Sequence, residues 1–562
     1  MNLNRVASLI LCSLFLSTLT AQVSEDIVPR SYSLPESFFH DGIASLPVLS
    51  PSDVAALDYR DDKLGHMPRF ARSVQTDISP TNAGTWYDVA DGRIWRCHIR
   101  SAGALALIPC YDAWYLPQGA TLHVYTPDMQ EVIGAFTSVN TSPDGHYNTG
   151  LIHGDECIIE YYEPAAVADK GKLHLNEVGY AYRMVPGRKA SRNFGDADAC
   201  EVNIACSEGA DWQDEKNAVV RMLVKLSSGY GWCTGTLMNN TNNDCEPYIL
   251  SADHCYQDES NNYVAATAAQ LNQWVFYFDY ESPTCANPAA EGTLGTNFVT
   301  GCSLRAASQD NGGDNGSDFV LVRTNVSPPA RFNPYYAGWS RGTATTSGVG
   351  IHHPNGDIKK ISTYTSQPSS SHWGTLTLNT HWKVLWAATA NGYGVTEPGS
   401  SGSGLFDSNH RLIGTLTGGG SSCSSPTQND FYGEVRYHWT SNGLTSDKQL
   451  GPWLDPVGTN ATTFDGAYDP CGMTIGIADV DAMINTAVYP NPSTGLFTVK
   501  NNAGMTSLTV TNAIGEVVMV QDITGRTTAQ VDMSSYAGGV YFFRFASARG
   551  AQTRKVVLDP SR

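Results

Sequence analysis

A serine enclosed by glycines lies in the segment Gly399-Ser400-Ser401-Gly402, shortly before an apolar, strand-like run. Glycines, which lack Cβ, permit sharp turns and leave successive N–H groups directed outward. Such a loop can carry a nucleophile and an oxyanion hole together: the Ser401 hydroxyl attacks a carbonyl, and the N–H groups of Gly399 and Ser401 receive the developing negative charge. Gly/Ser runs are usually ordinary loops, so the motif needs further support. The chemistry it predicts is acyl transfer.

A serine hydroxyl is a poor nucleophile near neutral pH and needs an imidazole to take its proton. Among the 14 histidines, His254 stands out because an apolar strand ends just before it and Cys255 follows it. Cys233, in a second short strand upstream, is placed to close a loop onto Cys255, and a disulfide there would hold the imidazole backbone rigid. For a lone histidine, however, a structural strand cap remains the better interpretation.

The third group of such a site is an aspartate held beside the imidazole and largely buried. Asp310, Asp314 and Asp318 share one Gly/Asn/Asp-rich loop, and only Asp318 runs directly into an apolar strand. We therefore predict Asp318 as the orienting carboxylate. The other two are expected to be solvated turn residues.

The order His254, Asp318, Ser401, each at a strand end, is accompanied by other motifs in register. Residues from Cys200 to about Pro456 resemble the lysyl endopeptidase branch of the chymotrypsin-like serine proteases. The stretches that carry the resemblance are Cys200–Cys206, Cys233–Thr236, Ser317–Phe319, Ala337–Trp339, Ile351–Asn355 and Val395–Ser403. The resemblance implies a secreted serine endopeptidase that cleaves after lysine through an acyl-enzyme. It also implies two packed β-barrels with the triad in the cleft between them.

The resemblance places the carboxylate that receives a cationic substrate side chain at Asp430, and it places Trp373 along the substrate site. A pair of unit charges at 4 Å is worth about 4 kcal/mol at an effective dielectric of 20, which favours Lys or Arg over neutral residues. The choice of Lys over Arg rests on the resemblance alone, and without it Asp430 would be interpreted as a surface turn residue. Thr417 stands where better-known members have a histidine stacked on the tryptophan, and Gly404 replaces a usual proline.

Cysteine usage fits an oxidising compartment, because removing an N-terminal signal leaves 12 of the 13 cysteines, an even number. The resemblance implies three disulfides: Cys200–Cys423, Cys206–Cys285 and Cys233–Cys255. Cys245 and Cys302 lie outside the family's usual set and are expected to pair with each other. The partners of the remaining four cysteines stay open: Cys97, Cys110, Cys157 and Cys471.

The N-terminal part of the chain favours export followed by activation. Residues 1–21 carry Arg5 and then an apolar run that is too short to span a membrane, which predicts a cleaved signal peptide. Residues 22–189 show short alternating apolar stretches and resemble a propeptide, which can template folding and cover the cleft of a zymogen. We expect activation near Arg188-Lys189 or Arg192, since a lysine-specific enzyme could cut this basic linker itself.

The predicted protease domain, residues 190–468, has many short strands, frequent Gly/Asn turns and no long helical period, so an all-β class is predicted. The formal net charge of −19 argues against a nucleic-acid partner and mildly favours cationic substrates. No cofactor is predicted. A metal site at His352 and His353 is disfavoured, because Pro354 begins a turn there, and no CxxC motif has a matching second half.

A linker at 469–484 leads to residues 485–562, which begin with a Tyr489–Pro492 motif and contain the strand-like run Gly539–Phe545. This part resembles the C-terminal sorting domain of type IX secretion substrates, a small β-sandwich. The secretion machinery is therefore an expected partner, besides the propeptide and protein or peptide substrates with lysine at the cleavage site. The competing interpretation is an ordinary β-sandwich adhesion module.

Two other functions remain open. One is a trypsin-like enzyme that accepts Arg and Lys alike, and the other is a surface adhesin that keeps a protease fold without using it. The predicted base must be neutral to accept a proton, so we expect activity to fall below roughly pH 6.5.

Overall fold

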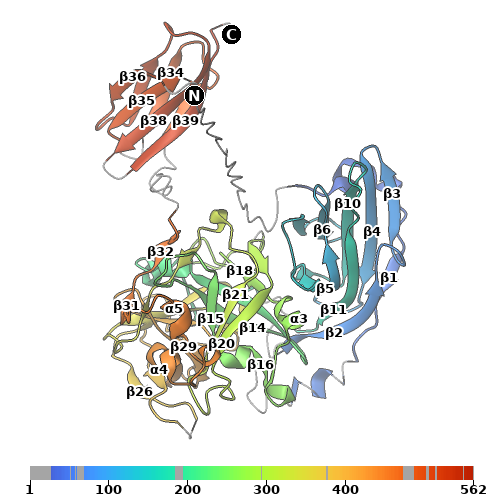
Figure 1. Cartoon of the computed structure of the whole chain (residues 1–562), viewed down its shortest axis with the longest axis vertical. Helices are drawn as coiled ribbons and strands as arrows, with labels where there is room; N and C mark the ends of the chain where they lie inside the picture. The colour runs from blue at the N-terminus through green and yellow to red at the C-terminus, as the bar shows by residue number, and fades with distance from the viewer. Residues whose placement is uncertain are drawn as a thin grey trace, which may run out of the picture. The chain divides into compact units, whose positions relative to one another are not determined.

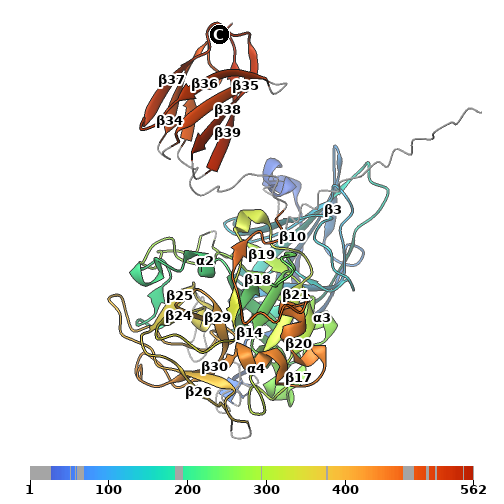
Figure 2. The same cartoon turned by 60° about the vertical axis from the view of Figure 1, so that its left-hand side comes forward.

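The computed structural model describes residues 27–50, most of 52–59, 69–183, 194–472 and 486–560, apart from gaps at 196, 293, 375–376, 502–504, 513–515 and 548–549. The chain forms two compact units, residues 1–471 and 472–562 (Figures 1 and 2). The predicted signal peptide, the activation segment from Arg188 to Arg192 and most of the predicted linker lie outside the described residues.

Strands dominate both units, so the all-β prediction is confirmed. The predicted protease domain, residues 190–468, is called the protease portion below. Its described α-helices span only four to six residues each: α2 (Gln213–Lys216), α3 (Ala268–Leu271), α4 (Val435–Thr440) and α5 (Gly451–Leu454). Among the described residues, no helix has the length and apolar character that a membrane span requires.

Residues 22–189, called the N-terminal portion below, contain a sheet of six strands. Its order is β1-β4-β10-β6-β7, with β3 paired to β4. The strands are β1 (Ile43–Ser45), β3 (Thr85–Val89), β4 (Gly92–Arg100), β6 (Thr121–Tyr125), β7 (Val132–Phe136) and β10 (Glu156–Pro164). The alternation predicted for residues 22–189 therefore corresponds to real strands with apolar side chains in a common core.

A second sheet, of twelve strands, joins this portion to the protease portion. Its order is β19-β18-β13-β14-β2-β11-β5-β8, with β9, β15, β20 and β21 paired beside this path. From the N-terminal portion come β2 (Arg69–Ile78), β5 (Ala106–Tyr115), β8 (Tyr147–Asn148), β9 (Ile152–His153) and β11 (Lys172–Ala181). From the protease portion come β13 (Val219–Leu226), β14 (Gly229–Met238), β15 (Tyr248–Ser251), β18 (Val275–Tyr277), β19 (Phe298–Thr300), β20 (Cys302–Ala307) and β21 (Val320–Thr324). The junction is the antiparallel pairing of β2 with β14, where Ala71 lies opposite Tyr230.

The second half of the protease portion is built on a sheet of ten strands. Its order is β12-β25-β24-β28-β29-β30-β27-β26, with β23 and β31 at the side. The strands are β12 (Val202–Asn203), β23 (Trp339–Ser340), β24 (Gly348–His352), β25 (Lys360–Tyr364), β26 (Ser369–Ser371), β27 (His381–Val384), β28 (Gly404–Asp407), β29 (Leu412–Gly419), β30 (Asp430–Glu434) and β31 (Thr463–Phe464). The glycine–serine loop lies directly before β28.

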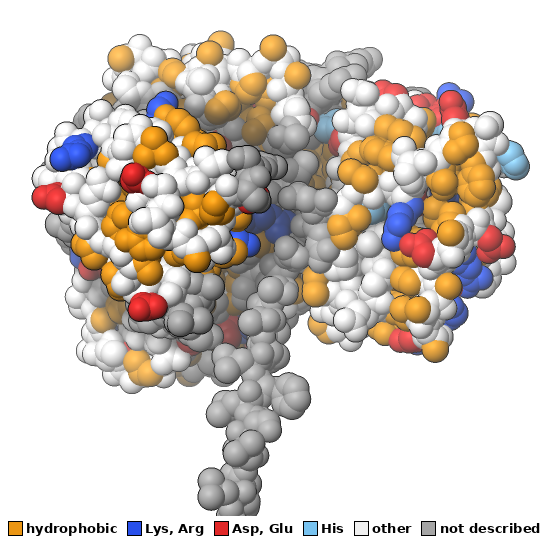
Figure 3. All heavy atoms as spheres, turned by 90° about the horizontal axis from the view of Figure 1, so that it is seen from above, with side chains coloured by type: hydrophobic (Ala, Val, Ile, Leu, Met, Phe, Trp, Pro, Cys, Tyr) orange, Lys and Arg blue, Asp and Glu red, His pale blue; other side chains and the backbone are white. Residues whose placement is uncertain are grey.

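The C-terminal unit is a small sandwich of two sheets, as predicted. One sheet contains β33 (Thr486–Tyr489), β34 (Leu496–Asn501) and β37 (Thr528–Asp532), and the other contains β36 (Val517–Asp522), β35 (Ser507–Asn512), β38 (Gly539–Ser547) and β39 (Gly550–Leu558). Phe497 and Phe543 join the two sheets with ring centroids 5.3 Å apart. Figure 3, which draws the whole chain from above, shows Lys and Arg as well as Asp and Glu side chains among hydrophobic ones.

Three of the four predicted disulfides are present: Cys200–Cys423, Cys206–Cys285 and Cys233–Cys255. The predicted Cys245–Cys302 pair is wrong, because Cys245 is bonded to Cys471. Cys302 is a free thiol at the start of β20, directed into the core beside the carbonyl of Leu271. Cys245 instead lies in a loop that packs against the chain end of this unit, which no local pattern could reveal. The other free thiols among the described residues are buried: Cys97, Cys110 and Cys157.

Candidate active site

His254 is held at the end of a buried strand. The four residues of β15 are all buried and pair with β14 on one side and β21 on the other. A short turn, Asp253–Cys255, follows, and its last residue is bonded to Cys233 in β14. The backbone at His254 is therefore fixed both by strand pairing and by a covalent link, as the sequence predicted.

Asp318 contacts His254 through both carboxylate oxygens. Its Oδ2 accepts from Nδ1 of the imidazole at 2.8 Å, and its Oδ1 accepts from the backbone N–H of the same residue at 3.0 Å. Asp318 is completely buried and His254 is 6% exposed. Because Nδ1–H is directed to the carboxylate, Nε2 is the nitrogen that remains to accept a proton in the neutral ring.

Electrostatics at this pair favour the charged imidazole. Burial lowers the pKa of His254, but the charge and hydrogen bond of Asp318 outweigh burial and raise that pKa to about 9. Burial acts on Asp318 in the opposite direction to the charge of His254, and the net result is a lowered pKa for the carboxyl. The acid limb of activity is thus expected above the pH 6.5 of an isolated imidazole.

Asp310 supports Asp318 from a buried position, whereas the sequence predicted a solvated turn residue. It is buried, with Oδ2 accepting the N–H of Asp318 at 2.8 Å and Oδ1 accepting the N–H of Gly313 at 2.9 Å. Burial and the charge of Asp318 raise the pKa of Asp310 to about 6. Asp314 is exposed, as predicted. The tight turn at Gly312-Gly313 folds Asp310 back over Asp318, and that turn was the available signal.

The loop that carries Ser401 packs against the segment that carries His254. The carbonyl of Ser401 accepts the backbone N–H of Thr234 at 2.8 Å and lies 3.8 Å from Sγ of Cys255. A Cβ at Gly402 would overlap Oγ of Ser251 at the end of β15, so only glycine permits this approach. The structure thus brings the two predicted catalytic segments together at adjacent residues.

The backbone of this loop leaves alternate N–H groups free for a ligand. Ser400, Gly402 and Ser403 donate their N–H groups to the carbonyls of Glu397, Leu416 and Ser400, respectively. Within the described residues, the N–H groups of Gly399 and Ser401 donate to no protein acceptor. These are the two groups that the sequence predicted as the oxyanion hole.

Asp430, at the start of β30, is completely buried. Its Oδ2 accepts from Nε1 of Trp386 at 2.6 Å and from Oγ1 of Thr396 at 2.8 Å, and its two oxygens also accept from the hydroxyl and the N–H of Ser421. Burial raises the pKa of Asp430, and these hydrogen bonds oppose it. A Cβ on Gly419 would overlap Oδ1, so no side chain fits beside this oxygen at residue 419.

Trp373 is 41% exposed and packs edge-on against Phe431, with centroids 5.8 Å apart. Oγ1 of Thr417 lies 2.9 Å from Nε2 of His381. His381 is completely buried, and burial lowers its pKa to about 4, so it is neutral at physiological pH. Sequence reasoning missed His381, which lies in a strand without a motif of its own.

Two parts of the chain match known protein families. Residues 194–433, which include the four positions His254, Asp318, Ser401 and Asp430, match the family described as the lysyl endopeptidase C-terminal domain. Residues 487–559 match the family described as the secretion system C-terminal sorting domain. A curated relative, the lysyl endopeptidase of Pseudomonas aeruginosa, is 32% identical over 374 residues, which cover 62% of this chain and 74% of the relative.

Solved structures of serine proteases are more distant. A thermostable serine protease, AL20, from an extremophilic microorganism is 13% identical with a TM-score of 0.28, covering 39% of this chain and 92% of its own. The HtrA-type protease AlgW is 13% identical with a TM-score of 0.28, covering 63% and 97%. A Glu endopeptidase is 15% identical with a TM-score of 0.23, covering 44% and 95%. At these values the structures add nothing to the two sequence matches.

Proposed function

Since the chain belongs to the lysyl endopeptidase family and is a serine endopeptidase, we propose that it cleaves peptide bonds on the C-terminal side of lysine. Ser401 is the nucleophile, and Nε2 of His254 takes its proton and returns it to the leaving amine. Asp318 orients the imidazole and stabilises its charged form, while the N–H groups of Gly399 and Ser401 stabilise the oxyanion.

The observation that carries the lysine preference is the environment of Asp430. The groups that hydrogen-bond to its carboxylate are all neutral: an indole N–H, two hydroxyls and one backbone N–H. A substrate cation can therefore supply the compensating charge that the buried carboxylate favours. The compact ammonium of lysine needs less space than the planar fork of arginine. Trp373 is proposed to line the same substrate site.

Digestion of a denatured protein, followed by mass spectrometry of the peptides, tests this specificity. Cleavage after Lys alone is expected. Cleavage after Lys and Arg alike would replace the proposal with a trypsin-like specificity, and cleavage after neutral residues would remove Asp430 from the substrate site.

The assignment of Ser401 is tested separately with diisopropyl fluorophosphate, an uncharged reagent for activated serines. Wild-type enzyme is expected to be phosphorylated at Ser401, and Ser401→Ala to be unlabelled and to lose about 10⁴–10⁶-fold in kcat. A folded wild-type protein that is neither labelled nor active would favour the adhesin.

We propose further that residues 22–189 are a propeptide whose described part stays bound after activation. The supporting contacts are buried: Arg69 pairs with Asp258 at 1% side-chain exposure on both sides, Lys225 pairs with Glu177, and Phe70 stacks on Trp232 at 4.7 Å. These contacts fall on β13, β14 and the segment after His254. The idea that the propeptide covers the cleft gains no support from them.

N-terminal sequencing and co-purification test this proposal. The mature chain is expected to start near Arg188-Lys189 or Arg192 and to retain the propeptide. Arg69→Ala leaves Asp258 buried without its charge partner, at a cost of about 3–5 kcal/mol, and should release the propeptide. Arg93→Ala is the control for loss of an ion pair elsewhere, because Arg93 pairs with Glu163 inside the N-terminal portion. Retention by Arg69→Ala would contradict this interface.

The sorting-domain match makes this a secreted or cell-surface protein. We propose that residues 1–21 direct the first export step as a signal peptide and that residues 485–562 engage the type IX secretion machinery. Deletion of 485–562 should leave active protease inside the cell envelope. Normal secretion of that deletion would assign the C-terminal unit to adhesion instead.

A further inference from the structure

A completely buried imidazole, His352, lies behind the nucleophile loop and takes no part in the chemistry above. It ends β24, and both of its ring nitrogens have hydroxyl partners. Nδ1 lies 2.8 Å from Oγ of Ser400, the residue before the nucleophile, and Nε2 lies 2.9 Å from Oγ of Ser362 in β25. The imidazole therefore bridges the sheet and the loop.

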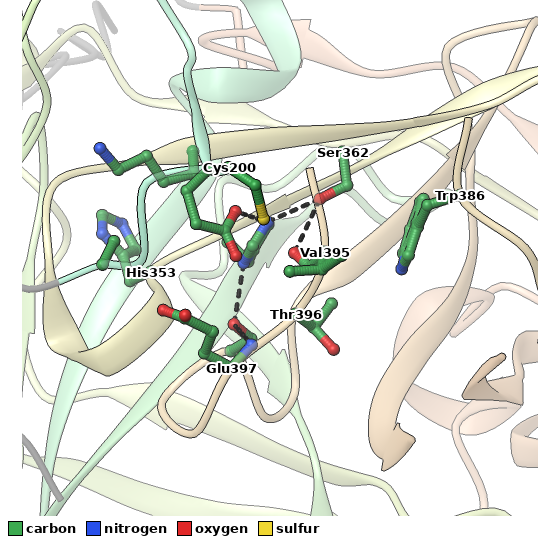
Figure 4. A network of polar contacts seen from close by, with 12 residues as sticks. Cys200, His353, Ser362, Trp386, Val395, Thr396 and Glu397 are labelled. Atoms are coloured by element: carbon green, nitrogen blue, oxygen red, sulfur yellow. Dashed lines mark hydrogen bonds and ion pairs between the residues drawn. The ribbon is translucent and has the colours of Figure 1, made fainter. Parts of the chain in front are cut away.

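Counting the protons of this network gives one arrangement. The hydroxyl of Ser362 donates its single proton to the carbonyl of Val395 at 2.9 Å, an interaction that Figure 4 shows as a dashed line. Ser362 Oγ must then accept from Nε2–H of His352. In the neutral ring Nδ1 carries no proton, so Ser400 donates its hydroxyl to it. Ser400 Oγ in turn accepts the N–H of Glu397 at 3.2 Å.

The surroundings keep this imidazole neutral. Burial and the nearby charge of Lys360 lower the pKa of His352 to about 3. The carboxyl of Glu201 lies 3.8 Å from Nε2, and burial raises its pKa, so it is shifted toward the uncharged form, which does not stabilise an imidazolium. The proton on Nε2 is therefore fixed over the working range of the enzyme.

The network fixes the peptide that carries one of the oxyanion donors. The carbonyl of Ser400 accepts the N–H of Ser403, and its own N–H donates to Glu397, so its side chain and backbone are both bonded. The peptide that joins Ser400 to Ser401 contains the Ser401 N–H. The orientation of that N–H depends on Ser400, and the orientation of Ser400 depends on His352.

We propose that His352 is a positioning residue for the oxyanion hole, acting through the Ser400 hydroxyl. The proposal rests on the proposed role of Ser401. It extends that role to a neutral histidine that fixes the direction of the Ser401 N–H without touching substrate.

The test is a double-mutant cycle on secreted, processed enzyme with a lysine amide substrate. His352→Ala is expected to lower kcat by about 10–100-fold, in the range seen when an oxyanion donor is misplaced, with KM nearly unchanged. Ser400→Ala should give a similar loss, and the double variant should lose no more than the larger single loss. His352→Gln offers one acceptor and one donor and should recover most of kcat.

Two further measurements separate positioning from general destabilisation. The rate of phosphorylation by diisopropyl fluorophosphate should fall with kcat, because its P=O oxygen occupies the oxyanion hole, while inhibition by n-butylamine, a lysine side-chain mimic, should not change. Thr324→Val removes a buried hydroxyl bonded to the carbonyl of Val326, away from the loop. It is the matched stability control and should keep kcat.

Wild-type kcat in folded His352→Ala, or additive losses in the double variant, would overturn the proposal. If His352→Ala does not fold, Ser400→Ala decides, since it keeps the imidazole, and wild-type kcat there would also overturn it. Failure of the proposed function is distinguishable, because Ser401→Ala would then retain activity.

Discussion

The two halves of the protease portion hold their catalytic groups by opposite electrostatic means. In the first half, His254 is paired with a buried carboxylate, and its pKa is raised to about 9 against the effect of burial. In the second half, His352 is also buried but faces two hydroxyls and the nearby charge of Lys360, and its pKa is lowered to about 3. Both imidazoles are buried, so the charge of the neighbouring groups makes the difference.

The comparison indicates why each partner suits its task. A general base must change its charge during the reaction, and a carboxylate stabilises the imidazolium that forms. A group that only fixes the direction of a peptide must not titrate, since a change of charge would rearrange its hydrogen bonds. A buried carboxylate therefore lies beside the imidazole that takes the proton, and neutral hydrogen bonds join His352 to Ser400.

The largest expected effect comes from removing the charge in the first half. Asp318→Asn should lower kcat by about 10⁴-fold, as loss of the orienting carboxylate does in serine proteases. It should also lower the pKa of His254, because burial then acts without its opponent. Steady-state kinetics across pH measures both effects. Asp314→Asn, at the exposed aspartate of the same loop, is the control and should change kcat little; a comparable loss there would place the effect in the loop rather than in the carboxylate.

The next largest loss of activity is expected at Asp430, the buried carboxylate proposed to bind the substrate cation. Asp430→Asn should lower kcat/KM on lysine substrates by about 10³-fold, the equivalent of the ~4 kcal/mol charge pair. Phosphorylation of Ser401 by the uncharged diisopropyl fluorophosphate should keep its wild-type rate. A parallel loss in both assays would mean that Asp430 supports the loop and not the substrate cation.

The pH dependence of wild-type enzyme sharpens the comparison without a mutation. Neutral His254 increases with pH, so kcat/KM should fall about tenfold per unit below its pKa. With that pKa raised to about 9, the midpoint should lie above 6.5. Assays of a lysine ester from about pH 5 to about pH 10 locate it. A midpoint at or below 6.5 would show that Asp318 does not outweigh burial.

The smallest effect on activity is expected at the disulfide Cys245–Cys471. This bond joins the loop after β14 to the end of the first compact unit, residues 1–471. Replacing both cysteines with serine should cost about 2–5 kcal/mol of unfolding free energy, because the open chain gains entropy when unfolded. Both histidine networks stay intact, so kcat should not change. Denaturant unfolding and kcat together check this. A fall in kcat would mean that the hydrogen-bond networks of His254 and His352 depend on this distant disulfide.

The residues whose roles were predicted from sequence share one feature: each is indicated by a local sequence pattern. His254 and Asp318 lie at the ends of apolar runs, and the glycines around Ser401 mark a close approach of backbone. Asp310 was wrongly expected in solvent because its burial depends on the loop folding back over Asp318. The sequence shows His352 in a motif but does not indicate its role, because its hydrogen-bond partner Ser400 is 48 residues away in the chain.

By itself the sequence determined the all-β class and the positions of the triad candidates, since strand alternation, glycine turns and contiguous motifs are local properties of the chain. Three disulfides were predicted from the family resemblance and not from a local pattern. Tertiary structure alone decided the Cys245–Cys471 bond, the joining of β2 to β14 and the opposite pKa shifts of two buried histidines. Each of these depends on which distant group lies within a few ångströms. Pairing distances and the balance between burial and charge exist only once the chain has folded.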